Sequence, residues 1–570
     1  MPIVVARRSG ERAAANIGRG MQGSQSVRSQ SSAQAFSPNR KGTPPARGSI
    51  VLAFLGLLAA CFPAAGTARA ATVESRSQMI VADNPLAAEA GQNILRAGGT
   101  ATDAAIAALL VLGLVEPEAA GIGGGAFLLH YSAESRRVDA YDGRETAPAG
   151  ANGRLFLDGD GSPLDYEKAA VGGRAVGVPG VLRLAKLAHQ DHGRLPWSAL
   201  FEPAIALAEQ GFPVSSRLHD AVADDKHLLA GSAAAYLTRR GGRAVGSGEQ
   251  LRSPAYAESL RRIAAGGPTA FYGGALAQNM LAAIRGDREN PGVMTLQDLE
   301  RYRAKRRLAI CVPYRAWRIC GAPPPTSGGL GVLQAMAILD RFDLAGLPPK
   351  DPAARRLMAE AERLALADRA LFLADPDYVE VPLQQLLDPA YLQRRAALIA
   401  SDGEPDAAAA GVAAMPDQPE PAVGTQLSVV DQWGNAVALT ASIGSPFGSG
   451  LMVDGFLLDN ALADFAFTPS VAGLPVANRA EGGKRPRSSM APTMVLDPQG
   501  RLVLTVGAAG GAPAIGAVVR ALVGVLDWGF DPADAISAAG AASGLNVIGR
   551  SGDSWVGAAD PRRHGVALAD

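Results

Sequence analysis

A threonine at the head of an apolar segment is the first residue whose type and position could do chemistry. Thr425 follows Gly424 in the stretch PAVGTQLSVVDQWGNAVALTASIG, residues 421–444. A threonine hydroxyl is a weak nucleophile that becomes effective when a base lies beside it. The α-amine of the same residue can be that base, because its pKa of about 7.7–8.0 lies close to working pH. Such chemistry requires the peptide bond between Gly424 and Thr425 to be cut first.

The surroundings of this bond suit a cut. A glycine before the threonine leaves the carbonyl accessible, and the Ala/Pro/Asp/Gly-rich linker 401–424 would let a new chain end move away. The local pattern by itself still favours a plainer interpretation, an ordinary threonine that begins a strand. The rest of the chain must decide between the two.

Other reaction types find little support in the motifs. The sequence has no HExxH, CxxC or GxSxG pattern, and its six histidines show no metal-ligand spacing. The stretch GIGGG, residues 121–125, lacks the Rossmann spacing and a Walker lysine. The sequence therefore predicts no cofactor and no metal. Its formal net charge of zero argues against a nucleic-acid partner, which usually requires a basic excess.

The elements that would position Thr425 can be outlined from the pattern. The stretch DNPLAAEAGQNILRAGG predicts a helix that Asp83 or Asn84 caps and that ends at Gly98. A second predicted helix, apolar almost all round, ends before Pro117. The pattern is mainly helical from about residue 175 to 400 and becomes strand-rich after Thr425. Because these strands are apolar on both faces, we expect a sheet covered by helices on both sides.

The N-terminal region is typical of an exported protein. Residues 1–48 are polar and predict a disordered leader. Residues 49–70 combine an apolar run with an ARA ending, the layout of a secretory signal. We therefore expect a periplasmic or secreted protein. The box LAAC also resembles a lipoprotein signal, so a membrane anchor is expected only if Cys61 is lipidated.

Two further cysteines flank the stretch VPYRAWRI, which predicts two strands joined by a tight turn. In an exported protein Cys311 and Cys320 can form a cross-strand disulfide. Two buried thiols fit the pattern equally well.

Long stretches of the chain resemble the γ-glutamyltransferase (glutathione hydrolase) family, from about residue 78 to 535. They include NPLAAEAGQNILRAGGTATDAAIAALLVLGLVEPEAAGIGGGAFLL, PPPTSGGLGVLQAMAIL, LSVVDQWGNAVALT and KRPRSSMAPTMVLD. The resemblance implies an α/β (α+β) fold, the four-layer αββα sandwich of N-terminal-nucleophile hydrolases. It also implies a proenzyme that cuts itself into two associated subunits with one common core. Here these would be a mainly helical segment 71–400, the linker 401–424 and a strand-rich segment 425–570.

The resemblance also implies an activity and roles for individual residues. The new N-terminal threonine would take the γ-glutamyl group from glutathione or other γ-glutamyl compounds and pass it to water or an amino acid. Cleavage would separate Gly424 from the nucleophile Thr425, which Ser442 helps to position. The other matched positions are, for the substrate α-carboxylate, Arg144, Ser488 and Ser489, for its α-amine Asp464, and for the oxyanion hole Gly510 and Gly511.

Several positions depart from the family pattern. The family's threonine lies four residues before the serine of SVVD, where this chain has Gly424; Thr425 lies three before Ser428. Gln426 replaces a histidine, and two further polar positions hold Gly444 and Ala461.

Two interpretations of the junction follow. Either the nucleophile is lost and the protein is an impaired homologue that binds γ-glutamyl compounds or amino acids, or one residue is deleted and Thr425 is the nucleophile. Residues an even number apart in a strand share a face, so Thr425 would need a bulge or a bent strand start to point like the family's threonine.

Overall fold

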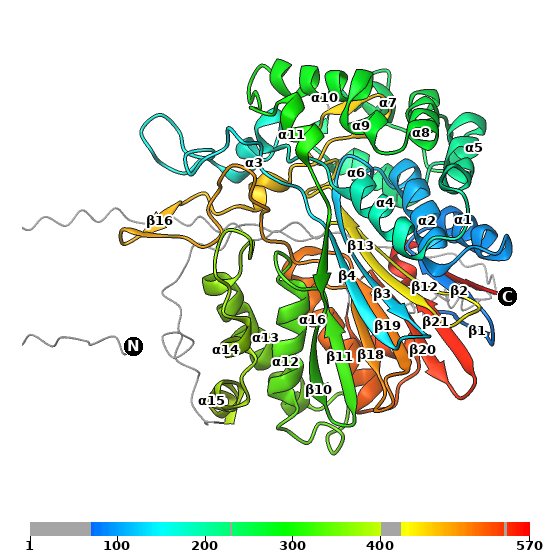
Figure 1. Cartoon of the computed structure of the whole chain (residues 1–570), viewed down its shortest axis with the longest axis vertical. Helices are drawn as coiled ribbons and strands as arrows, with labels where there is room; N and C mark the ends of the chain where they lie inside the picture. Colours follow the sequence, from blue (N-terminus) through cyan, green and yellow to red (C-terminus); the bar gives the residue numbers. More distant parts are fainter. Residues whose placement is uncertain (1–69, 229–230, 401–422, 541–543) are drawn as a thin grey trace, which may run out of the picture. The chain divides into compact units, whose positions relative to one another are not determined.

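Strand β12 (Thr425–Val430), which begins at the predicted junction, lies inside a seven-stranded antiparallel sheet (Figure 1). The computed structural model describes residues 70–228, 231–400, 423–540 and 544–570. The strands of this sheet are, in spatial order, β22 (Val566–Ala569), β2 (Met79–Ala82), β12, β13 (Ala436–Ser442), β3 (Gly125–Ser132), β4 (Arg137–Gly143) and β9 (Lys305–Leu308).

A second seven-stranded antiparallel sheet lies against the first. Its strands are, in spatial order, β1 (Thr72–Ser75), β21 (Ser554–Ala559), β20 (Leu545–Ser551), β19 (Leu502–Ala508), β18 (Thr493–Leu496), β11 (Trp317–Gly321) and β10 (Ile310–Tyr314). Four two-stranded ribbons complete the described strands: β5 (Phe212–Pro213) with β8 (Gln250–Leu251), β6 (Thr238–Arg239) with β7 (Arg243–Ala244), β14 (Met452–Val453) with β15 (Phe456–Leu457), and β16 (Ser470–Val471) with β17 (Leu474–Pro475).

Helices cover the outer face of each sheet (Figure 1). Those of the N-terminal part are α1 (Pro85–Arg96), α2 (Ala101–Val115), α3 (Tyr166–Ala169), α4 (Val181–His192), α5 (Glu202–Gln210), α6 (Ser216–Asp224), α7 (Ala234–Leu237), α8 (Pro254–Gly266), α9 (Thr269–Tyr272), α10 (Gly274–Gly286) and α11 (Leu296–Arg301). The others are α12 (Gly328–Leu339), α13 (Pro352–Phe372), α14 (Leu383–Leu386), α15 (Pro389–Ala400), α16 (Gly511–Leu526) and α17 (Pro532–Ala538). Helices α9, α10 and α11 lie beyond the end of the strands (Figure 1).

Three buried clusters define the layers. One packs α1, α2 and their neighbours on the sheet of β12, and another packs α12, α13 and α16 on the sheet of β19. The third lies between the sheets and joins side chains such as Phe127 and Leu129 to Met494 and Ile548. The four-layer αββα sandwich is thus confirmed. The expectation of helices on both sides of one sheet was wrong, because the inner face of each sheet packs on the other sheet.

The two parts of the chain form one core. In the first sheet β12 and β22 of the C-terminal part pair with β2, and β13 pairs with β3. In the second sheet β21 pairs with β1, and β18 pairs with β11. The predicted leader 1–48, the signal up to residue 69 with Cys61, and residues 401–422 of the linker lie outside the described residues. None of the helices in the described part is both long and apolar enough to span a membrane.

The first two helices begin as their sequences predict. Asn84 caps α1 and accepts a hydrogen bond from the backbone of Leu86 at 3.0 Å. Thr100 and Asp103 form a capping box at α2. Asp83, the alternative cap, is fully buried and turns instead toward β12. This leaves a carboxylate beside the start of the strand.

The cysteine pair is resolved in favour of the disulfide. Cys311 and Cys320 lie directly opposite each other in β10 and β11, with their Cα atoms 4.1 Å apart, and their sulfur atoms are bonded. The bridge closes the hairpin at the edge of the second sheet.

Candidate active site

A pocket at the end of β13 gathers the residues predicted to bind the substrate. Arg144 directly follows β4, Asp464 ends the short 3-10 turn Ala461–Asp464, and Ser488 and Ser489 precede β18. All four line one pocket together with Ser442, Gly510 and Gly511. Segments more than 300 residues apart in sequence therefore meet at one site.

Arg144 is fixed before any ligand arrives. Its side chain is 1% exposed, and its guanidinium pairs with Glu145 at 2.9 Å and with Asp464. It also donates to the backbone carbonyls of Pro486 and Arg487, at 3.1 and 3.2 Å. Burial disfavours its charged form, but Glu145 and Asp464 together raise the pKa of Arg144. The guanidinium therefore stays charged.

Opposite charges meet at this wall of the pocket. The carboxylate of Asp464 is 23% exposed beside the buried guanidinium of Arg144. An Arg and an Asp side by side can hold the carboxylate and the ammonium of an α-amino acid at the same time. The wall is thus suited to the zwitterionic end of such a ligand.

Hydroxyl and backbone groups complete the pocket. Ser489 Oγ accepts a hydrogen bond from Arg369 at 2.8 Å, and Ser488 Oγ accepts one from the backbone of Met490 at 3.2 Å. Gly510 and Gly511 begin α16 with φ of +121° and +59°, a backbone shape that favours glycine. Because helix N-termini present backbone N–H groups, they can stabilise an oxyanion there.

Gly424 directly precedes β12 and lies beside Ser442, a residue that lines the pocket. The pairing of β12 with β13 begins at Thr425, which lies opposite Ala441. A Cβ atom on Gly424 would lie 3.5 Å from Cβ and 3.7 Å from Oγ of Ser442. Gly424 also has a φ of +127°. A side chain at 424 would thus reach the pocket, but the backbone there is shaped for glycine.

The structure does not bring Thr425 to this pocket. Its side chain is fully buried on the opposite face of β12, where Oγ1 donates to Asp83 at 3.1 Å. Between residues 425 and 441 the pairing of β12 with β13 runs without a register shift. The bulge that would turn Thr425 toward Ser442 is therefore absent from the uncut chain.

A second polar cluster surrounds Thr425 on that opposite face. Asn546 donates to Asp83 at 2.9 Å, and Arg563 Nη1 donates to the carbonyl oxygen of Gly424 at 2.8 Å. Arg563 also lies 4.0 Å from Asp83. Burial raises the pKa of Asp83, although Arg563 and Arg217 counteract the shift. The junction thus has a charged site on each side.

Comparisons with known proteins agree with this geometry. Residues 87–542 match the family model described as Gamma-glutamyltranspeptidase. The chain belongs to the gamma-glutamyltranspeptidase family. It is 36% identical to the glutathione hydrolase proenzyme of Bacillus subtilis strain 168 over 468 residues, 80% of this chain and 78% of that protein. It is equally identical to the Acylase ACY 1 proenzyme of Pseudomonas sp. strain SE83 over 470 residues, 81% of each chain.

A solved structure supports the same assignment. Cephalosporin acylase from Bacillus halodurans superposes with a TM-score of 0.75 and 25% identity, covering 90% of this chain and 99% of the acylase. The fold is that of an N-terminal-nucleophile hydrolase of the gamma-glutamyltranspeptidase family. Because similar relatives are named both as glutathione hydrolases and as acylases, family membership leaves the substrate open.

Two departures from the family pattern have a structural explanation. A Cβ at Gly444 would lie only 1.9 Å from Oδ1 of Asn460, so a larger residue there would displace this amide. Gln426 is buried between the sheets and accepts a hydrogen bond from Thr440 at 2.5 Å. Ala461 is buried and offers no polar group to a ligand.

Sequence reasoning missed several residues at the two sites. Thr440 and Arg487 line the pocket, and Asp83, Asn546 and Arg563 surround Thr425. Asp83 was interpreted only as a helix cap. Thr440 and Arg487 lie within stretches that resemble the family but received no role. Asn546 and Arg563 follow no motif, and only the tertiary fold brings them to the junction.

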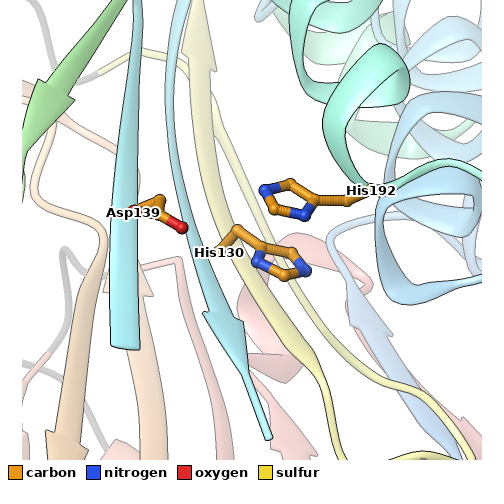
Figure 2. A group of neighbouring side chains, drawn as sticks. All are labelled: His130, Asp139 and His192. Atoms are coloured by element: carbon orange, nitrogen blue, oxygen red, sulfur yellow. The ribbon is translucent and has the colours of Figure 1, made fainter. Parts of the chain in front are cut away.

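A third cluster could hold a cation. His130 of β3, Asp139 of β4 and His192 at the end of α4 have ligand atoms within 4.8 Å of one another (Figure 2). The two imidazole rings stack with centroids 3.5 Å apart. Burial and the neighbouring His192 lower the pKa of His130 to about 3, so it is neutral, as a metal ligand must be. The spacing of the histidines in the sequence gives no sign of this cluster, because its side chains come from three separate elements.

This cluster is separate from the pocket. His130 lies five residues along β3 from Gly125, the partner of Ser442. At about 3.4 Å per residue this is roughly 17 Å. The hydroxyl of Tyr141 also lies 2.7 Å from Nε2 of His192 and donates to Asp191. The cluster therefore does not share residues with the pocket.

Proposed function

We propose that the protein is a self-processing γ-glutamyl hydrolase or transferase. It cuts itself between Gly424 and Thr425, removes the γ-glutamyl group from glutathione or other γ-glutamyl compounds, and passes it to water or an amino acid. The observation that carries the proposal is the pair of opposite charges, Arg144 and Asp464, in a pocket next to the junction. A γ-glutamyl group ends in the α-carboxylate and α-amine that this pair can hold.

The pocket also fits a zymogen. Val423, just before the junction, is one of its lining residues. Cleavage releases Val423 and Gly424 from the new chain end and opens that side of the pocket. The same cut frees the α-amine of Thr425 and removes the restraint that Gly424 imposes on it. The terminal threonine then turns its hydroxyl from Asp83 toward Ser442, which is the step the proposal requires.

Chemistry at the pocket follows from the groups in place. The Thr425 hydroxyl attacks the γ-carbonyl while its own amine accepts the proton. The backbone N–H groups at Gly510 and Gly511 stabilise the resulting oxyanion. The leaving amine departs, and water or an amino acid takes the acyl group from the threonine. These proposed reaction steps use neither a metal nor a cofactor.

The test is a matched pair of substrates. A γ-glutamyl anilide and a glutaryl anilide differ only by the α-amine that Asp464 would bind. The processed protein should release aniline from the γ-glutamyl compound at least ~10²-fold faster in kcat/KM, since the analogue lacks the ammonium group that Asp464 would bind. Asp464→Asn should remove most of this preference. Equal rates would identify a general acylase, and no release from either compound would contradict the proposal.

A second candidate is binding without turnover. The observation that favours it is the orientation of the junction, with Gly424 on the pocket face and the Thr425 hydroxyl on the other. In this case the protein stays a single chain and binds glutathione, glutamate or related amino acids through Arg144 and Asp464. Calorimetry on the uncut protein that shows glutamate binding, with no aniline release, would establish it. Two fragments and substrate turnover would reject it.

A further inference from the structure

The face of β12 opposite the pocket carries the parts of a second reaction centre. The groups there are a hydroxyl, a carboxylate, a guanidinium and a carbonyl. Thr425 Oγ1 donates to Oδ2 of Asp83 at 3.1 Å, and Arg563 donates to the carbonyl oxygen of Gly424 at 2.8 Å. That carbonyl belongs to the peptide bond whose cleavage is proposed above.

We propose that Asp83 and Arg563 are catalytic residues for the self-cleavage of the Gly424–Thr425 bond. Asp83 is the general base for the Thr425 hydroxyl, and Arg563 stabilises the oxyanion that forms on Gly424. This inference rests on the proposed self-processing and names the groups that perform it. It also assigns separate places to the two reactions: self-cleavage on the Asp83 face, substrate turnover on the pocket face.

Covalent connectivity brings the nucleophile to its target. The atoms Oγ1, Cβ, Cα and N of Thr425 and the carbonyl carbon of Gly424 form a five-membered ring when Oγ1 attacks. The attack is therefore intramolecular, and such reactions gain most of the entropy that two separate molecules would lose. What the protein must supply is a base and charge stabilisation, and Asp83 and Arg563 contact the two atoms that need them.

The proposed cleavage of the Gly424–Thr425 bond needs no reactant other than water. Asp83 takes the hydroxyl proton as Oγ1 bonds to the carbonyl carbon, and the oxyanion forms against Arg563. The C–N bond then breaks, and Asp83 returns the proton to the leaving nitrogen, which leaves Gly424 as an ester on Thr425 Oγ1. Water hydrolyses this ester. The products are the carboxylate of Gly424 and the free amine and hydroxyl of Thr425.

The surroundings hold both groups in position. Asp83 is fully buried, and it accepts hydrogen bonds from Asn546 at 2.9 Å and from the backbone of Gln426 at 3.3 Å. Its orientation is thus fixed toward Thr425. Gly424 has a φ of +127°, and a Cβ there would lie 2.9 Å from the carbonyl oxygen of Ala441. The backbone therefore favours glycine at the residue whose carbonyl is attacked.

The charged groups that face Asp83 support its role as a base. Arg563 and Arg217 favour its ionised form, whereas burial raises its pKa, and Glu116 lies within electrostatic reach. Arg217 in turn pairs with Glu116 and lies 3.5 Å from Glu118. A carboxylate with a raised pKa is a stronger base than an exposed one. We expect cleavage to accelerate with rising pH as Asp83 loses its proton.

The test follows cleavage of the full chain during cell-free synthesis, with fragments identified by mass. Asp83→Asn should slow the cut at Gly424–Thr425 by at least ~10²-fold, the usual effect of losing a general base. Arg563→Met should slow it by ~10²–10³-fold, as for loss of an oxyanion donor. The matched controls are Asp431→Asn, another buried acid next to β12, and Arg550→Met, an exposed arginine of β20; both should be cut at the unsubstituted rate.

The outcomes separate this inference from the function on which it rests. An unsubstituted chain that is never cut overturns self-processing itself. A chain that is cut at Gly424–Thr425, and whose Asp83→Asn variant is cut equally fast, overturns only the role of Asp83. If that variant does not fold, the pH profile of the unsubstituted chain decides. A rate that does not rise between about pH 4 and pH 9 would exclude a buried carboxylate as the base.

Discussion

The two faces of β12 at residues 424 and 425 carry different kinds of polar site. On one face, Arg144 and Asp464 meet in an open pocket where Asp464 is partly exposed. On the other, the fully buried Asp83 and the half-buried Arg563 lie against the junction. An open pair of charges can exchange its partners for a ligand, whereas a buried pair acts only on the chain itself. In the proposed function, the start of β12 thus separates the site that would bind the substrate from the site that would cut the chain.

The largest expected effect is the loss of the hydroxyl that the buried face holds. Thr425→Ala should reduce the rate of self-cleavage by roughly 10⁴-fold or more, as loss of a nucleophile does. Thr425→Ser keeps a hydroxyl and should still be cut. Gel analysis of the full chain measures both. A Thr425→Ala chain that is cut at the same bond would show that the two faces do not divide the chemistry in this way.

The next effect concerns the pocket face alone. Asp464→Asn should weaken binding of glutamate by about 10–100-fold, because a charge-assisted hydrogen bond contributes about 1.5–3 kcal/mol. Arg137→Lys, an exposed arginine at the start of β4, is the matched control and should bind normally. Calorimetry on uncut Thr425→Ala protein measures the affinity without turnover. Unchanged affinity in Asp464→Asn would show that Asp464 does not bind the α-amine of glutamate.

The buried face should also make stability depend on pH. Burial raises the pKa of Glu116 to about 8, even though Arg217 opposes the shift. The folded protein therefore holds this proton more tightly than the unfolded chain. The stability that protonated Glu116 contributes is fully present below about pH 4.5 and is lost as pH rises toward 8. Glu116→Gln should flatten the fall of Tm across this window by the equivalent of about 5 kcal/mol, since one pKa unit corresponds to about 1.4 kcal/mol.

Two results bear on that pH prediction. Glu258→Gln, an exposed acid on α8, is the control and should leave the slope of Tm against pH unchanged. A Tm that rises with pH between 5 and 8 in the unsubstituted chain would contradict the assigned sign. The measurement uses uncut Thr425→Ala protein so that cleavage does not change the melting transition.

The smallest expected effect concerns Gly424, the residue just before β12. Gly424→Ala should lower the free energy of unfolding by about 1–2 kcal/mol, because alanine is strained at a φ of +127° and its Cβ would press on Ala441. Gly552→Ala, also at positive φ but with open space around it, separates backbone strain from contact. Chemical unfolding of both variants gives the difference. Equal losses would show that the carbonyl of Ala441 moves aside.

Much of the fold was predictable from local pattern. The α1 and α2 signals include a cap, a buried face and a terminating glycine or proline, which are properties of neighbouring residues. The stacking of two sheets was not predictable from apolar strands, since a face buried by helices and one buried by another sheet look alike. Only the resemblance to the gamma-glutamyltranspeptidase family predicted that two sheets stack on each other. The residues at Arg144, Asp464, Ser488 and Ser489 were found in the same way and meet in the structure.

By itself, the sequence determined that a glycine and a threonine stand at the head of a strand, and that an odd spacing separates Thr425 from Ser428. It could not determine where each face of that strand leads. Tertiary structure decided this, because the register with β13 sends position 424 toward Ser442 and Thr425 toward Asp83. Asp83 and Arg563 are 480 residues apart in the chain, and no local rule relates them. Side-chain direction in a strand is a local property, but what it meets depends on strands paired from distant parts of the chain.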